Sequence, residues 1–331
     1  MSDAPTVSVV VATHDRRSSL ARLLRALERQ RGAPPFEVVM VDDGSTDGTD
    51  EELERLAGHA SVPFTPLRID ANGGPAVARN RGWRAARGAV IAFTDDDCTP
   101  QPGWLACLAG ALKDADVVQG RTVPDSAQMS RRNAFSHTVI VEKEWGFYEA
   151  CNIGYRREVL ERLDGFDERF GAGAPGAGPP FGEDTDLAWR ARAAGARVVF
   201  EENALVVHDI RRRSYVDHLR AMRRREGLVR AVRTNPALRE RLHHRWFWRA
   251  SHPPALAAAV GVLLLFSNPT SGWRRLGGIA LAAPYVDFRT RVSPLGRRRN
   301  WPAVIPLALG ADLVEIGVLA RASVRYRTLL L

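Results

Sequence analysis

The chain has 331 residues, of which 45% are hydrophobic and 26% charged, and this composition excludes an intrinsically disordered protein. Its net charge is +9, and almost all of the positive charge comes from arginine. The cysteines Cys98, Cys107 and Cys151 are widely spaced and form no C-x-x-C pair, which argues against a disulfide framework or a zinc ribbon. Because the first apolar run begins almost at the N-terminus, without a signal segment, we expect the protein in the cytoplasm.

Short apolar runs alternate with amphipathic segments in the first half of the sequence, which predicts an α/β domain with a largely parallel sheet. Strands are expected at 7–12, 36–41, 64–69, 89–94 and 116–119. Helices are expected over 20–27, from a Thr49-x-x-Glu52 capping box onward, from Pro75 to about residue 88, and over 104–112. The resulting order is that of strand–helix units repeated along the chain.

The second half has a different pattern. Periodicity is weak between residues 120 and 150, and a segment rich in glycine, proline and alanine follows at 171–182. Glu183-Asp184 then opens a helical stretch at 185–194, and short strands are expected at 198–200 and 205–207. From about residue 216 the chain is Arg-rich and helical, with apolar segments at 253–266, 276–286 and 301–319. We therefore expect a catalytic domain at 1–215 and a helical region at 216–331.

Arginine clusters in this C-terminal region, at 211–213, 223–225 and 297–299, suit a nucleic acid, an anionic membrane surface or no partner at all. No nucleic-acid-binding motif accompanies them, so we expect no nucleic acid as a partner. The first two apolar segments are shorter than the roughly 20 residues of a membrane span, and basic residues flank every segment. This pattern favours association with a membrane surface. The alternative is a helical hairpin packed against the catalytic domain.

Polar clusters follow three of the predicted strands, at residues 13–15, 42–45 and 95–97. Ligands of open α/β sheets bind beyond the carboxyl ends of the strands, so we expect the three clusters to meet at one edge. The third cluster contains Asp95 and Asp97, whose hard oxygen ligands suit Mg²⁺ or Mn²⁺. A solvated turn explains any one of these clusters well, but it explains three clusters at strand ends poorly.

Two common nucleotide-binding motifs are excluded. Residues 171–176 spell G-x-G-x-x-G, but they follow no strand and contain a proline, so they fail the structural context of a dinucleotide site. The segment directly after the first strand, residues 13–17, contains no glycine, and the sequence contains no G-x-x-x-x-G-K-[ST] phosphate loop. The chain is therefore neither an NAD enzyme nor a P-loop ATPase.

A set of motifs in a fixed order resembles the family 2 glycosyltransferases with the GT-A fold, over about residues 7–215. That resemblance implies a mixed, mostly parallel sheet flanked by helices, here with a C-terminal helical, partly apolar appendage. The motifs after the first strand are Asp42-Asp43-Gly44-Ser45-x-Asp47, Asn72-Gly73-Gly74-Pro75-Ala76-x-Ala78-Arg79-Asn80, Phe93-Thr94-Asp95-Asp96-Asp97-Cys98-x-Pro100 and Gly182-Glu183-Asp184.

The resemblance implies a nucleotide pocket and a metal site. Asp42 and Asp43 would read the base and ribose of the donor, Thr13 would line the same pocket, and Arg79 would lie near the nucleotide. Asn80 is expected to hold a loop to its helix. Asp97 would coordinate a divalent metal, Mn²⁺ or Mg²⁺, and Asp95 would face the ribose or a metal-bound water. Asp96 occupies the variable place of the motif, and His208 matches a histidine that completes the metal site in some members.

The resemblance also implies the chemistry. Asp184 takes the place of the catalytic base, which would accept the proton of an acceptor hydroxyl in a single inverting displacement, while Glu183 would share the proton or contact the acceptor. The alternative for both residues is an acidic first turn favoured by the helix dipole. The adjacent segment at 171–182 has the composition of a mobile lid.

The sequence thus predicts a metal-dependent, hexosyltransferase-like enzyme that acts on a membrane-linked or cell-envelope acceptor at the inner face of the cell membrane. A UDP-sugar is the default donor, with dTDP- and GDP-sugars as alternatives. One alternative function is a non-catalytic sugar-nucleotide-binding or membrane-scaffold protein of the same fold. Another is a nucleotidyltransferase, for which only Arg16-Arg17 hints at the basic phosphate loop that such an enzyme needs.

Overall fold

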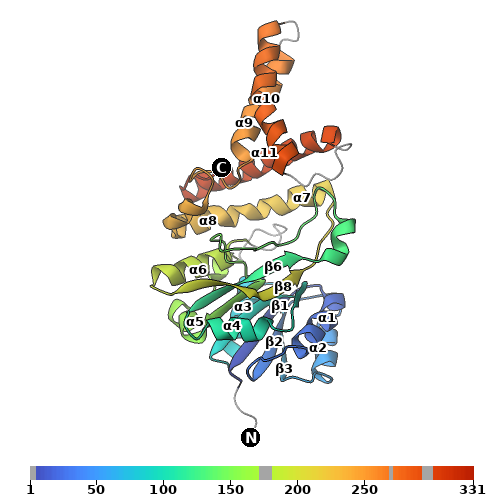
Figure 1. Cartoon of the computed structure of the whole chain (residues 1–331), viewed down its shortest axis with the longest axis vertical. Coiled ribbons are helices and arrows are strands. Elements are labelled where there is room, and N and C mark those ends of the chain that lie inside the picture. Colours follow the sequence, from blue (N-terminus) through green and yellow to red (C-terminus); the bar gives the residue numbers. More distant parts are fainter. Residues whose placement is uncertain (1–4, 171–180, 268–270, 293–300) are drawn as a thin grey trace. The chain divides into compact units, whose positions relative to one another are not determined.

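The structure is a computed structural model that describes residues 5–170, 181–267, 271–292 and 301–331 (Figure 1). The chain divides into two compact units. The first unit contains Met1–Ser130 and Thr138–Ile210, and the second contains Arg131–His137 and Arg211–Leu331. Of the segments that the sequence singled out, most of the 171–182 lid and the arginines at 297–299 lie outside the described residues.

Within the described part of the first unit, eight strands form one sheet in the order β3-β2-β1-β4-β7-β6-β8-β5. The pairs β3–β2, β2–β1, β1–β4 and β6–β8 are parallel, whereas β4–β7, β7–β6 and β8–β5 are antiparallel. The mixed, mostly parallel sheet that the sequence predicted is therefore confirmed. The strands are β1 Val7–Thr13, β2 Phe36–Asp43, β3 Phe64–Ile69, β4 Val90–Asp95, β5 Cys98–Pro100, β6 Val117–Pro124, β7 Asn152–Arg156 and β8 Val198–His208.

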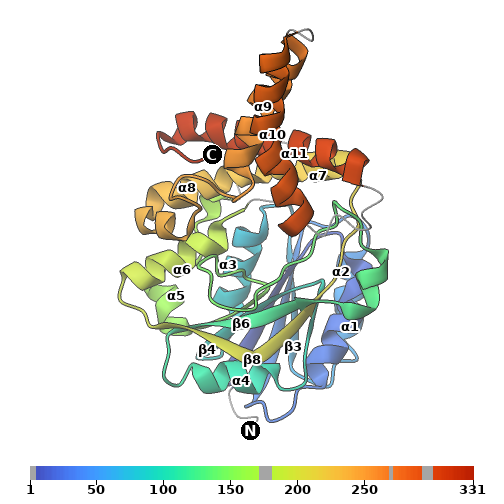
Figure 2. The ribbon, with the colours of Figure 1, turned by 45° about the horizontal axis from the view of Figure 1, so that its top comes forward.

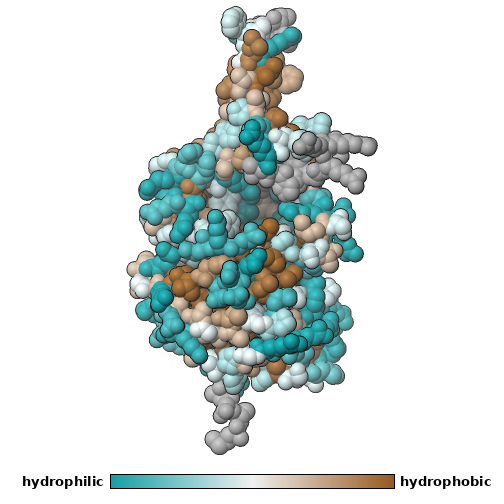
Figure 3. All heavy atoms as spheres, viewed as in Figure 1, coloured by the Kyte–Doolittle hydropathy of each residue, from teal (hydrophilic) through white to brown (hydrophobic). Residues whose placement is uncertain are grey.

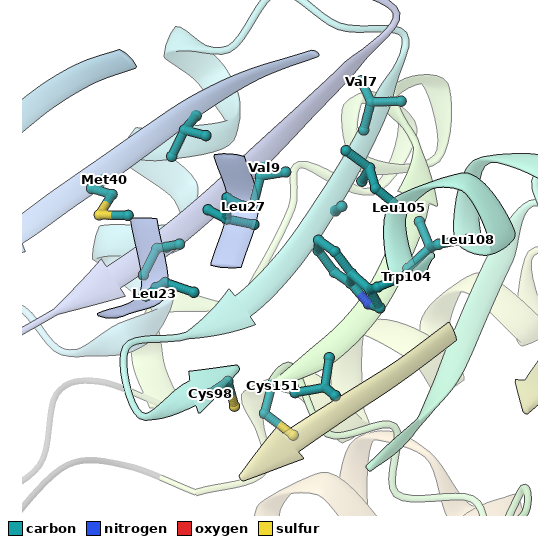
Figure 4. Close-up of a cluster of buried hydrophobic side chains, with 14 of the residues drawn as sticks. Val7, Val9, Leu23, Leu27, Met40, Cys98, Trp104, Leu105, Leu108 and Cys151 are labelled. Atoms are coloured by element: carbon teal, nitrogen blue, oxygen red, sulfur yellow. The ribbon is translucent and has the colours of Figure 1, made fainter. Parts of the chain in front are cut away.

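Helices pack along this sheet (Figure 2). They are α1 Arg17–Glu28, α2 Thr49–Ala57, α3 Pro75–Ala85, α4 Trp104–Ala111, α5 Arg157–Leu163 and α6 Glu183–Ala193, with short 3₁₀ turns at η1 Ser126–Arg131 and η2 Glu168–Phe170. The β-branched run of β1 places Val7, Val9 and Val11 on one face, because successive side chains of a strand alternate. Those side chains belong to one buried cluster with Leu23 and Leu27 of α1, Met40 of β2, and Trp104, Leu105 and Leu108 of α4 (Figure 4).

Two sequence predictions need correction. The Thr49-x-x-Glu52 capping box is wrong, because the residue that precedes α2 is Gly48, at φ 82°, and Thr49 donates its hydroxyl to Asp47 Oδ1 instead. The two short strands predicted at 198–200 and 205–207 form a single strand, β8, which passes a register shift opposite Gly120 and Arg121 of β6. The prediction that Glu183-Asp184 opens a helix is confirmed, because α6 begins at Glu183.

Helix α3 covers the other face of the sheet through a close approach at Gly82. A Cβ atom added there would lie 2.5 Å from Val10 Cγ1 and 3.1 Å from Val41 Cγ2, both in the sheet.

We expect Gly82→Ala to lower the free energy of unfolding by about 1–3 kcal/mol, as overpacking of a core does. The matched control is Gly110→Ala in α4, where no atom outside the adjoining helix backbone lies within 4 Å of the added Cβ. Helix propensity alone should then raise stability by about 0.5–1 kcal/mol. Urea unfolding of both variants checks the pair, and equal effects would contradict the close packing.

The second unit is helical. Its elements are α7 Tyr215–Met222, η3 Arg223–Arg225, α8 Glu226–Thr234, η4 Pro236–Arg241, α9 His252–Ser267, α10 Gly272–Val292 and α11 Trp301–Tyr326. The apolar segments of the sequence thus lie in α9, α10 and α11. Among the described helices, α11 alone has the length and composition of a membrane span, and 33% of its apolar stretch is buried in the structure. It packs against α7, α8 and α9 and carries two buried carboxylates, Asp312 and Glu315.

Candidate active site

The polar clusters at the strand ends meet at one edge of the sheet, as the sequence predicted. Thr13, the last residue of β1, pairs with Asp42 of β2, and its neighbour Ala12 pairs with Asp95 of β4. The Thr13 hydroxyl also donates a 2.8 Å hydrogen bond to Asp96 Oδ2. Parallel pairing of three adjacent strands therefore places all three clusters side by side.

Asp42 and Asp43 brace the loops around this edge. Asp42 is fully buried and accepts hydrogen bonds from Arg68 Nη1 at 3.0 Å and from the Ser45 amide at 3.1 Å. Asp43 accepts from the amides of Gly73 and Gly74, each at 2.8 Å, and burial raises its pKa in spite of these bonds. A carboxylate offers about four acceptor positions, and these hydrogen bonds occupy two of them on each side chain.

Arg79 joins the two acidic parts of the site, which are far apart in the sequence. Its Nη2 donates to Asp95 Oδ1 at 3.0 Å, and its Nη1 donates to Glu183 Oε1 at 2.9 Å. Burial by itself would lower the pKa of Arg79, but the neighbouring Asp95, Glu183 and Asp184 carboxylates raise it, so the guanidinium stays charged. Within the described residues, the buried Glu183 Oε2 atom has no hydrogen-bond partner, which leaves one acceptor atom beside Arg79 for a bound molecule.

The turn after β4 gives its three aspartates different surroundings. Asp96 faces Thr13 and lies 3.8 Å from Arg16 Nε, and burial together with Asp97 raises the pKa of Asp96 to about 8. Asp97 is 6% exposed, and burial raises its pKa as well, although His208 opposes this shift. Asp95 is the most exposed of the three and faces Arg79. The variable position, Asp96, is therefore committed to contacts within the protein.

His208 reaches this turn through β5, a strand that the sequence analysis did not predict. Cys98 of β5 pairs with His208 of β8, and the His208 Nε2 atom lies 3.6 Å from Asp97 Oδ1. The other ring nitrogen, Nδ1, is 2.8 Å from the carbonyl oxygen of Asp209, a contact that fixes the orientation of the ring. Asp97 and His208 thus lie close enough to share one ion.

The donor atoms at this position fit a divalent metal. Potential ligand atoms of Asp97, Cys98 and His208 lie within 4.8 Å of one another, and all three residues are buried. Mn²⁺ and Mg²⁺ favour oxygen and nitrogen ligands over thiolate, and Cys98 packs with Cys151 in the buried cluster (Figure 4). One carboxylate and one imidazole remain, a combination suited to Mn²⁺ and acceptable to Mg²⁺ when phosphate oxygens complete the shell.

Asp184 lies in the first turn of α6, next to Glu183. Its Oδ1 accepts a 2.7 Å hydrogen bond from the Thr185 amide, and its Oδ2 accepts a 3.1 Å bond from the Ala150 amide. Burial and the adjacent Glu183 carboxylate raise the pKa of Asp184 to about 8, although Arg79 opposes the shift. A partly exposed carboxyl group with such a pKa can exchange a proton near neutral pH.

The sequence analysis missed Glu149, which precedes the amide that holds Asp184. Its side chain accepts from Trp145 Nε1 at 3.1 Å, and burial raises its pKa to about 7. No motif singled it out, because weak periodicity hid the segment at 120–150. The prediction for Asn80 is confirmed: its Nδ2 donates to the carbonyl oxygen of Phe166 at 2.9 Å, and its Oδ1 accepts from the Phe166 amide at 2.9 Å.

Comparison with known proteins gives a consistent family. The model of the family described as Glycosyl transferase family 2 matches residues 8–164. The pre-mycofactocin glycosyltransferase of Mycobacterium tuberculosis is 31% identical over 222 residues, which cover 62% of this chain and 43% of that protein. The succinoglycan biosynthesis protein ExoO of Rhizobium meliloti is 32% identical over 241 residues, 66% of each chain. The matched part of the chain thus spans 43% of the length of the first of these relatives and 66% of the length of the second.

The fold has solved counterparts. The mannosyltransferase PcManGT from Pyrobaculum calidifontis, solved in complex with GDP-Man and Mn²⁺, superimposes with a TM-score of 0.55 at 23% sequence identity. The superposition covers 98% of this chain and 88% of that chain. At this level of identity the likeness concerns the fold.

Proposed function

Because the chain belongs to glycosyl transferase family 2, whose model matches residues 8–164, we propose that it moves a sugar from a nucleotide diphosphate donor to an acceptor hydroxyl with inversion at the anomeric carbon. The observation that carries the proposal is the bridge through Arg79, which holds Asp95 and Glu183 in one site. The Arg79 guanidinium is thus a single buried cation with Asp95 on its proposed donor side and Glu183-Asp184 on its proposed acceptor side. Such an arrangement suits a reaction in which one group leaves on one side and another attacks from the opposite side.

In the proposed donor site, Thr13, Asp42 and Asp43 border the base and ribose at the ends of β1 and β2. Free acceptor positions on the two carboxylates would take hydrogen bonds from ribose hydroxyls or a base N–H. Asp95, held by Arg79, would face the ribose, and Arg79 would keep this carboxylate in place beside the nucleotide. A UDP-sugar remains the default donor, and dTDP- and GDP-sugars are the alternatives.

Asp97 and His208 would hold a divalent metal, Mn²⁺ or Mg²⁺, with Asp95 next to them on the same turn. When bound, the metal would neutralise the charge that develops on the departing diphosphate. Support comes from the donor atoms within 4.8 Å of one another and from the Mn²⁺ in the structure of the mannosyltransferase. Asp96, whose contacts are to Thr13 and Arg16, would take no part in metal binding.

Asp184 would be the catalytic base. Its carboxylate would accept the proton of the acceptor hydroxyl while that oxygen forms a bond to the anomeric carbon and the bond from this carbon to the diphosphate oxygen breaks. The amides of Thr185 and Ala150 fix the orientation of the carboxylate. Glu183 Oε2 would position the acceptor by accepting a hydrogen bond from a second hydroxyl.

The physiological setting belongs to the same proposal. We place the reaction in the synthesis of a cell-envelope glycan, glycolipid or polysaccharide, on a hydroxyl acceptor that is linked to a lipid, at the cytoplasmic face of the membrane. The succinoglycan relative supports a role in glycan synthesis. Residues 1–215 would form the catalytic domain, and residues 216–331 the membrane-associating region.

A panel of sugar nucleotides tests this function. Each UDP-, dTDP- and GDP-sugar is added at about 100 times its dissociation constant, with Mn²⁺ or with EDTA, and thermal unfolding is recorded. The cognate donor should stabilise the protein by about 2.7 kcal/mol, which raises Tm by about 5–10 °C, and only when Mn²⁺ is present. Release of the nucleoside diphosphate then reports turnover. If no donor in the panel shifts Tm, the proposed function is wrong.

A further inference from the structure

The second unit carries a helical hairpin, α9 and α10, whose outer segment exposes large apolar side chains. We define the outer segment as residues 260–267 of α9 and 272–279 of α10. The exposed fractions of its large apolar side chains run from 36% for Val262 to 87% for Trp273. Figure 3 shows hydrophobic side chains gathered on the hairpin. The exposed apolar residues of the outer segment are Val260, Val262, Leu263, Phe266, Trp273, Leu276 and Ile279.

The two helices pack through glycine, which explains why the large side chains point outward. A Cβ added at Gly261 would lie 2.6 Å from the Gly278 carbonyl oxygen, and one added at Gly278 would lie 2.7 Å from the Gly261 carbonyl oxygen. The two backbones are thus in close contact at these glycines, where Leu265 of α9 packs directly against Gly278. Helix pairs that pack through small residues and turn their large apolar side chains outward are typical of a lipid environment.

The root of the hairpin, in contrast, is fixed by buried polar contacts to α11. In α9, the His252 Nε2 atom lies 3.2 Å from Glu315 Oε2, and both side chains are fully buried. In α10, the Tyr285 hydroxyl donates a 2.9 Å hydrogen bond to Asp312, to which Arg289 also donates. Each helix of the hairpin thus has its own buried carboxylate in α11. The root is anchored within the protein, and the outer segment is left exposed.

Charge on the outer segment indicates what covers it. Arg274 and Arg275 follow Trp273 directly, and the sequence contains no acidic residue between positions 252 and 286. A second copy of the chain would bring the same positive charge to the contact, which disfavours self-association through this face. Anionic phospholipid headgroups above acyl chains offer negative charge to the arginines and an apolar phase to the remaining side chains, and tryptophan prefers the boundary between the two.

The dimensions also fit a shallow insertion. Residues 260–266 and 273–279 each advance by about 9 Å along a helix axis at 1.5 Å per residue. Interfacial elements bury their apolar surface about 5–10 Å into the boundary of headgroups and acyl chains, whereas a span requires about 30 Å. We propose that the outer segment of the α9–α10 hairpin inserts into one leaflet of an anionic membrane. If the proposed function holds, this insertion brings the protein to a lipid-linked acceptor; that consequence rests on the proposed function.

Flotation of the full-length chain with vesicles tests the insertion. Vesicles of phosphatidylcholine alone are compared with vesicles that contain phosphatidylglycerol. The wild-type chain should float with the anionic vesicles. The double variant Leu263→Ser/Phe266→Ser should bind the vesicles on the order of 100-fold more weakly, because it lacks two apolar side chains whose transfer from water into the membrane favours binding. Arg274→Ser/Arg275→Ser should lose on the order of 10-fold, on anionic vesicles only. The matched control, Val324→Ser/Leu329→Ser, removes exposed apolar side chains elsewhere in the second unit and should float like wild type.

The proposal would be overturned by wild type that does not float, by a Leu263→Ser/Phe266→Ser variant that floats like wild type, or by a control variant that fails to float. A wild-type dimer in light scattering that becomes a monomer in Leu263→Ser/Phe266→Ser would assign the hairpin to self-association and would also overturn it. Nucleoside diphosphate release without vesicles is measured for every variant. A variant that no longer floats but still releases nucleoside diphosphate supports the insertion. If flotation is retained but none of the proteins releases nucleoside diphosphate, only the proposed function is contradicted.

Discussion

Asp184→Asn should lower kcat by about 100- to 10,000-fold, because the amide cannot accept the proton of the attacking hydroxyl. Donor affinity should change little, since Asp184 belongs to the proposed acceptor side of the site. The variant also carries a structural cost. Asp184 accepts hydrogen bonds from two amides, of Thr185 and Ala150, and asparagine can accept only one of them with its oxygen. We therefore expect a loss of stability of about 1–3 kcal/mol, and turnover is to be measured where the variant is folded.

Asp186→Asn is the matched control for this change. Asp186 is buried in the same turn of α6 but forms an ion pair with Arg190 at 2.7 Å. Its replacement should reduce stability yet leave kcat within about threefold of wild type, because the residue has no proposed role in proton transfer. If both variants lose activity equally, the loss reflects the architecture of the turn and Asp184 is not the base.

The pH profile provides a second readout of the same carboxyl group. Burial and Glu183 raise the pKa of Asp184 to about 8, and the base acts only when deprotonated. Consequently kcat/KM should rise with pH to a plateau, with a midpoint at about 8, because this quantity reports groups of the free enzyme. Asp184→Asn should abolish this rise. A wild-type profile that is flat between about pH 6 and 9 would contradict the assignment.

Asp97→Ala should weaken donor binding in the presence of Mn²⁺ on the order of 100-fold or more, because the variant loses the proposed carboxylate ligand of the metal. Calorimetric titration of the cognate donor with Mn²⁺ and with EDTA measures the effect. Wild type should show a large difference between the two conditions, and the variant should show almost none. An unchanged response to Mn²⁺ in the variant would remove Asp97 from the metal site.

Asp96→Asn is the control for this second prediction. Its neighbour Thr13 donates to Asp96 Oδ2, and an asparagine oxygen can accept the same hydrogen bond. The variant should therefore retain the difference between Mn²⁺ and EDTA. A loss of this difference in Asp96→Asn would show that the middle aspartate, and not only its neighbours, contributes to metal binding.

The central strands and their polar ends could be predicted from the sequence because both depend on local patterns. A β-branched run such as Val7–Thr13 marks a buried parallel strand, and parallel strands bring their carboxyl ends to one edge. That rule predicts that Thr13, Asp42 and Asp95 lie together, and the strand pairing confirms it.

Long-range pairing could not be predicted in the same way. Strand β5 has three residues, too few for any periodic signal, and yet it joins Asp97 to His208. The bridge from Arg79 to Glu183 connects residues 104 positions apart, and nothing in either local sequence marks the partner. The capping box failed for a related reason: Thr49 matched the motif, but Gly48 adopts the left-handed conformation before the helix and Asp47 takes up the Thr49 hydroxyl.

The pairing of β5 with β8 has a consequence for the order in which the enzyme is made. His208 ends β8, the last strand of the described residues, whereas Asp97 is synthesised with the central part of the sheet. A nascent chain that has formed β1 to β4 therefore has most of the proposed nucleotide-binding edge but lacks the imidazole beside Asp97. Pairs so distant in sequence form late, because closing the intervening loop costs entropy before any contact is gained. The proposed metal site would thus be assembled after the proposed nucleotide-binding edge, and on this proposal an incomplete chain would not transfer sugar.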